Sequence, residues 1–228
     1  FNFHSNIKKT NFSNNYDPHF IPYVSYFLNH NKKSNVLEIS DAYHLNYREY
    51  MYKQNNYLVP KLILLDSYTQ TYTEDYKKDI KNKFKNYLFM PQNSDDISNN
   101  ISNRLISYKS EFNSFDMIFG HTEMWNEFFF LNACFTLNII NYLRVSIISL
   151  RFLKIGGTFQ ITLSPGFSTK ATLDFFDIIG KYFNNYKIHN YNISGFKYFV
   201  LDLINFRGIE EKELEQLFKL YEDTNKYK

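Results

Sequence analysis

The sequence predicts an α/β fold in which a mostly parallel, twisted sheet carries helices on both faces and ends in an antiparallel strand. Three observations predict it. Short apolar runs recur along the chain, segments of helical periodicity separate them, and a glycine pair lies between a long helical segment and an apolar run. Continuous apolar runs are typical of strands buried on both faces of a parallel sheet. Strands that alternate with helices indicate an open, doubly wound sheet.

Five apolar runs are predicted as strands because each is short and is bounded by turn-forming or charged residues. They lie at 35–40, 61–66, 115–119, 157–163 and 198–204, and a weaker run lies at 85–90.

Three segments are predicted as helices. Thr122 can cap a long helix over 123–153, which Gly156 and Gly157 would stop, with one glycine in the left-handed conformation of a helix cap. The segments 169–183 and 209–221 carry apolar residues at three- and four-residue spacing. Residues 128–150 could span a bilayer by length, but several asparagines and Arg144 favour a buried helix, so no membrane span is expected.

The organisation along the chain indicates one domain. The 228 residues contain no internal repeat or linker, and 44% of them are hydrophobic, which argues against intrinsic disorder. We expect a single domain over 1–228, with an N-terminal extension at 1–34 and a C-terminal helix at 209–228.

A lone cysteine, Cys134, excludes a disulfide framework and a cysteine-based zinc site within this chain, and its helical apolar setting indicates an inert thiol. No signal peptide is visible, so an intracellular location is expected rather than secretion.

Composition gives little functional information. The net charge of +3 is too small to require a nucleic-acid partner, and the abundance of Asn, Lys, Phe and Tyr is typical of A/T-rich coding. The lysine-rich segment 77–85 could meet RNA phosphates, or it could be a solvated helix face. The sequence lacks glycine-rich phosphate loops, dinucleotide-binding fingerprints and nucleophile elbows. No motif therefore supports an NTPase, a dehydrogenase or a hydrolase function.

The string LRFLKIGGTFQITL at 150–163 carries a resemblance. In this string a leucine-rich helix end is followed by a glycine pair and directly by a strand. This order resembles the second half of class I S-adenosylmethionine-dependent methyltransferases, and most of all the FtsJ-like branch, whose members are RNA ribose 2′-O-methyltransferases. The resemblance covers roughly residues 36–207. It implies a Rossmann-like methyltransferase fold whose sheet closes with strands at 186–191 and 198–204. It also implies S-adenosylmethionine as the cofactor, if there is any.

The resemblance implies cofactor contacts at Glu38 in the first strand, Ser40 at its end, Asp66 after the second strand, and Gly120. Glu38 and Asp66 could equally be ordinary strand residues facing solvent or a loop. Such enzymes have a glycine-rich loop after the first strand because the backbone passes close to the cofactor. Residues 36–47 contain no glycine, and the first glycine of the chain is Gly120. Tyr43 and His44 are therefore expected to crowd that site.

The family's Lys-Asp-Lys-Glu tetrad is mostly substituted. By the resemblance, His121 takes the aspartate position, Thr162 that of the second lysine, and Lys197 that of the glutamate. Lys8 or Lys9 could supply the first lysine. Threonine cannot act as a base at neutral pH, whereas a histidine such as His121 could, in a different chemistry. A metal site at His121 and Glu123 is not predicted, because no third ligand follows at a suitable spacing.

Three functions remain open from the sequence. The first is a degenerate FtsJ-like protein that acts as a non-catalytic scaffold or regulatory subunit, with RNA or a protein complex as its partner. The second is an active RNA 2′-O-methyltransferase, acting on cap or ribosomal RNA, with an atypical cofactor loop. The third is a methyltransferase of small molecules or proteins, which would need no tetrad. The missing glycines and the missing lysine favour the first.

Overall fold

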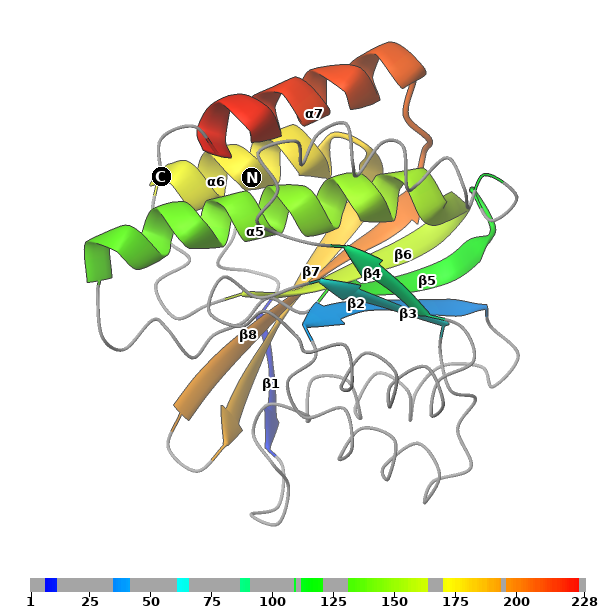
Figure 1. The fold of residues 1–228 in the computed structure, drawn as a ribbon. Coiled ribbons are helices and arrows are strands. Elements are labelled where there is room, and N and C mark those ends of the chain that lie inside the picture. Colours follow the sequence, from blue (N-terminus) through cyan, green and yellow to red (C-terminus); the bar gives the residue numbers. More distant parts are fainter. Residues whose placement is uncertain are drawn as a thin grey trace, which may run out of the picture.

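The computed structural model describes residues 7–11, 35–41, 61–65, 87–90, 109, 112–120, 131–163, 170–193 and 196–225. Eight strands and three helices are defined within these ranges (Figure 1). The strands are β1 (Ile7–Asn11), β2 (Val36–Asp41), β3 (Lys61–Leu65), β4 (Tyr87–Met90), β5 (Phe115–Gly120), β6 (Leu153–Leu163), β7 (Phe183–Ile193) and β8 (Phe196–Phe206). The helices are α5 (Leu131–Phe152), α6 (Lys170–Gly180) and α7 (Glu211–Asn225).

The strands form one sheet in the order β1-β7-β8-β6-β5-β2-β3-β4. The strand β8 is antiparallel to both of its neighbours, and every other neighbouring pair is parallel. This arrangement confirms the predicted fold class, a mostly parallel sheet with an antiparallel closing strand. All six predicted runs form strands, and the expected strand at 186–191 is part of β7.

The three described helices lie on one face of the sheet (Figure 1). On that face, the apolar side chains of Leu37, Ile39, Ile118, Phe159 and Ile161 are buried in the core beneath them. On the opposite face, Phe119 and Val200 are 1% and 0% exposed. The sheet is therefore buried on both faces at these positions.

The part of α5 from residue 142 to 150 is enclosed from every side. All of its residues from 142 to 150 are buried, which spans more than two helical turns and includes every direction around the axis. Val145 packs toward the sheet, and Tyr142 lies against Phe175 of α6 with ring centroids 5.5 Å apart. The long apolar segment is thus a core helix, as the polar residues within it predicted.

Helix α7 covers the remaining side of α5 and runs antiparallel to it. Glu211 at its start forms an ion pair with Arg151 near the end of α5, and Tyr221 lies near Arg144 farther back along α5. Arg144 and Tyr221 are 4% and 1% exposed. Burial raises the pKa of the Tyr221 hydroxyl, and the Arg144 guanidinium opposes that rise.

The connection from α5 to β6 differs from the predicted helix cap. The helix ends at Phe152, and β6 begins at the next residue. Leu153 pairs with Phe115 and Thr158 pairs with Met117, so β6 bulges over residues 154–157. Gly156 has a φ of 84°, which fits glycine, but it lies in this bulge and not at the helix end. A Cβ on Gly157 would lie 2.7 Å from the Leu153 side chain, so the bulge needs both glycines.

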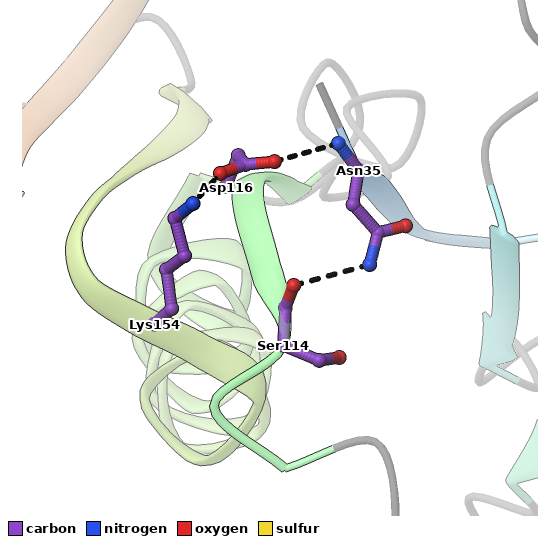
Figure 2. Close-up of polar contacts among 4 residues, drawn as sticks. All are labelled: Asn35, Ser114, Asp116 and Lys154. Atoms are coloured by element: carbon purple, nitrogen blue, oxygen red, sulfur yellow. Dashed lines mark hydrogen bonds and ion pairs between the residues drawn. The ribbon is translucent and has the colours of Figure 1, made fainter. Parts of the chain in front are cut away.

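A polar cluster fixes the amino-terminal edge of the sheet (Figure 2). Asp116 of β5 accepts a hydrogen bond from the Asn35 backbone nitrogen at 2.7 Å and pairs with Lys154 of β6. The Asn35 side chain donates to the Ser114 carbonyl at 3.1 Å. These contacts join the beginnings of β2, β5 and β6, and so hold β2 in register.

Replacing Asp116 with alanine is expected to lower the free energy of unfolding by about 1 kcal/mol, because the carboxylate is only partly shielded from water. Urea unfolding measures the loss. The Lys154→Met variant removes only the ion pair with Asp116, and it is expected to lower the free energy of unfolding by less than Asp116→Ala does. An equal loss in both variants would mean that the bond to Asn35 contributes nothing.

Candidate functional site

The carboxyl ends of β2, β3 and β5 meet at one edge of the sheet, because these strands are parallel neighbours. In an open α/β sheet this edge is the usual place for a ligand. Glu38 pairs with Phe119 and with Leu62, and Ser40 pairs with Leu64. Gly120 pairs with Ile39. Three of the proposed cofactor positions, Glu38, Ser40 and Gly120, therefore lie on two adjacent strands, whereas Asp66 falls outside the described residues.

Gly120 has a packing role in this structure. A Cβ built on it would lie 2.3 Å from Cγ1 of Val145 and 3.1 Å from the ring of Phe159. The space that the missing side chain leaves is thus occupied by α5 and β6. Gly120 allows α5 to approach the sheet closely, and its role as a cofactor contact remains a prediction.

The positions compared with the tetrad lie on different parts of the sheet. Thr162 pairs with Val200 of β8, and Lys197 pairs with Asn192 of β7, three residues earlier along β8. His121 follows the end of β5 and lies outside the described residues, as do Tyr43 and His44. The roles of all three remain predictions.

The two candidate first lysines lie on β1. Lys8 pairs with His189 of β7, and Lys9 pairs with Asn190. Since His189 pairs with Val200 and Val200 with Thr162, the positions of Lys8, His189, Val200 and Thr162 follow one another across four adjacent strands.

A buried polar network, which the sequence did not predict, lies across β6, β8 and β7. The Gln160 side chain donates a hydrogen bond from Nε2 to Oδ1 of Asp202 at 2.7 Å. The other carboxylate oxygen lies 2.6 Å from Nε2 of His189. Gln160 and Asp202 are 3% and 4% exposed, and the His189 side chain is 20% exposed.

This network can hold an imidazole in a fixed orientation. A buried carboxylate with one oxygen on an amide and the other on a histidine sets the position of the ring. The sequence signal was available, because Asp202 interrupts the apolar run FVLDLI and Gln160 interrupts the run TFQITL. Charged residues are almost never fully buried without a partner, so such interruptions indicate a pairing across strands.

Among the residues that the structure describes, no group of three or more His, Cys, Asp or Glu side chains could hold a metal ion. Within the same ranges, no helix combines the length and the apolar character needed to cross a bilayer.

Comparisons with known proteins give similarity in structure only. No protein-family model matches the sequence, and no curated protein matches it. The fold is similar to that of a protein from Plasmodium falciparum described as a ribosomal RNA methyltransferase, with a TM-score of 0.50 and 16% identity, over 83% of this chain and 96% of that one. It is also similar to the N-terminal domain of human METTL16 in complex with SAH, with a TM-score of 0.51 and 11% identity, over 82% and 70% of the two chains.

The strand order, the antiparallel β8 and these similarities agree with one another. The chain has the fold of the S-adenosylmethionine-dependent methyltransferases.

Proposed function

We propose that this chain is a relative of the FtsJ-like RNA ribose 2′-O-methyltransferases that has lost catalysis and acts as a scaffold or regulatory subunit of a larger complex. The observation that carries the proposal is Thr162, near the end of the strand that follows the glycine pair. The resemblance requires a lysine there, and a threonine hydroxyl cannot take a proton at neutral pH.

The cofactor edge supports the same proposal. The sequence from Val36 to Tyr47 has no glycine, and Gly120 is filled by the packing of α5. The glycine-free segment and the close packing at Gly120 support the loss of the backbone cradle that S-adenosylmethionine needs in this fold.

Cofactor binding is the direct test. The melting temperature is expected to stay unchanged when S-adenosylmethionine or S-adenosylhomocysteine is added. A binder at about 100 times its Kd would gain roughly 2.7 kcal/mol of stability, which a thermal-shift experiment or calorimetry detects easily. The Tyr43→Gly/His44→Gly variant tests the steric reason, since a gain of binding in that variant alone would support crowding. A clear shift in the unmodified protein would overturn the proposal.

An active methyltransferase is the second candidate, and the network of Gln160, Asp202 and His189 favours it. A histidine held by a buried carboxylate could accept a proton from a substrate hydroxyl or amine. Transfer of a labelled methyl group to RNA, lost in the His189→Gln variant while the melting temperature is kept, would establish this candidate.

A further inference from the structure

We propose that the interface between α5 and α7 holds a small monovalent anion between the Arg144 guanidinium and the Tyr221 hydroxyl. The observation behind it is a buried positive charge on α5 for which the described residues supply no negative charge. The inference does not depend on the proposed function, because this site lies between two helices, apart from the cofactor edge and from the buried network across β6, β8 and β7.

Two hydrogen-bond donors lie at this interface without an acceptor. Arg144 is 4% exposed and Tyr221 is 1% exposed. Among the residues that the structure describes, neither Nε of Arg144 nor the Tyr221 hydroxyl has a hydrogen-bond partner. The Nε–H group of arginine can only donate, and a buried donor without an acceptor is destabilising. A hydroxyl also donates, so one acceptor between the two side chains would satisfy both groups.

The guanidinium charge also has no counterion in the described part of the chain. The ion pairs found there join other side chains, namely Arg151 with Glu211, Lys154 with Asp116, Lys170 with Asp174, Lys181 with Glu213 and His189 with Asp202. Burial raises the pKa of the Tyr221 hydroxyl, so this group stays protonated at neutral pH and supplies no negative charge. Arginine keeps its proton in proteins. The positive charge of Arg144 therefore requires an anion from solution.

A buried water molecule is the alternative occupant, because ordered waters often satisfy buried polar groups. Water would accept hydrogen bonds from both donors, but it would leave the charge of Arg144 without compensation. A buried charge that lacks a partner is strongly destabilising. An anion satisfies the two donors and the charge together, and so accounts for more of what the interface shows.

The surroundings of Arg144 favour a singly charged anion. Ile140 and Ile148 lie one turn to either side of it on α5, and both are 0% exposed. Leu217, which is 5% exposed, lies one turn before Tyr221 on α7. One guanidinium balances one negative charge, so a divalent anion would carry an uncompensated charge into these apolar surroundings. Chloride and a short carboxylate such as acetate have the required charge and size, whereas sulfate does not.

The dependence of stability on anion concentration tests the proposal. Sodium chloride replaces sodium gluconate at constant ionic strength, because gluconate is too bulky for a site that is this deeply buried. An anion that binds only the folded state lowers the unfolding equilibrium constant about tenfold for each tenfold rise in its concentration above Kd. Urea unfolding measures the constant. Parallel titrations with acetate and sulfate distinguish the sources of charge, and sulfate is expected to have no specific effect.

The Arg144→Met variant removes the charge and keeps an apolar stem. It is expected to fold, because replacing a buried charge by an apolar side chain of similar volume is often neutral or stabilising. Its stability is expected to be independent of chloride, and Tyr221→Phe is expected to need more chloride for the same effect. The matched control is Arg207→Met, which removes an exposed arginine charge between β8 and α7. It is expected to respond to chloride as the unmodified protein does.

Bromide locates the site directly. In crystals grown with sodium bromide, anomalous scattering is expected to place one bromide between Arg144 and Tyr221. A water molecule at that position would overturn the proposal, as would a stability that does not change with chloride or acetate. An equal chloride dependence in Arg144→Met and in the unmodified protein would also overturn it, because a general effect of salt would then explain the result. Stabilisation by sulfate alone would contradict a monovalent occupant.

Discussion

Replacing Asp202 with alanine is expected to lower the free energy of unfolding by about 3 kcal/mol. The change removes both acceptors of the buried network and leaves Nε2 of Gln160 and Nε2 of His189 without this carboxylate. A buried polar group that loses its partner costs its full desolvation free energy, and two such groups are affected here. Urea unfolding, with the slope m checked for constancy, measures the loss.

Two variants give the controls. The Asp202→Asn variant keeps one oxygen as an acceptor for Gln160 but places an amide nitrogen toward His189. Its free energy of unfolding is therefore expected to lie between those of the unmodified protein and of Asp202→Ala. Asp177→Ala removes an exposed carboxylate from α6 and is expected to change stability by less than about 0.5 kcal/mol. If Asp202→Ala costs no more than Asp177→Ala, the network does not stabilise the fold.

Replacing Gly120 with alanine is expected to lower the free energy of unfolding by about 2 kcal/mol. The added methyl group would lie 2.3 Å from Val145, so α5 must shift away from the sheet. Chemical denaturation of the purified variant measures the effect.

The Val145→Ala variant completes a double-mutant cycle with Gly120→Ala. It removes the obstructing methyl groups, and the double variant is expected to lose less stability than the sum of the two single changes. Strict additivity would contradict the steric explanation, because the two side chains would then not interact.

Much of the sheet could be predicted from the sequence. Each apolar run that was long and continuous, such as 115–119 and 157–163, forms a strand, because burial on both faces requires apolar residues at every position. The helix α5 was predictable because its long apolar segment is also buried in the core.

The strand β1 could not be predicted, because IKKTN has one apolar residue and two lysines. Its structure comes from pairing with β7, which is some 180 residues away in the sequence, and such non-local pairing overrides local preference. The bulge at Gly156 was missed because a glycine after a helix fits a cap equally well.

The candidate site was predictable only in part. Sequence reasoning placed Glu38, Ser40 and Thr162 on strands, and the structure agrees with that placement. It missed the bond between His189 and Asp202, because their meeting depends on the register of an antiparallel hairpin. It also did not predict that Gly120 packs against Val145 and Phe159, because these neighbours become visible only in three dimensions.

The antiparallel docking of α7 on α5 also bears on the order in which the chain assembles. Until α7 has left the ribosome, one flank of α5 stays open to water and the Arg144 guanidinium keeps its hydration. Synthesis of Leu214, Leu217 and Tyr221 then supplies the apolar cover for that flank. The middle of this polypeptide therefore completes its burial only after translation has passed residue 221, and a nascent chain halted earlier would expose an aggregation-prone helix.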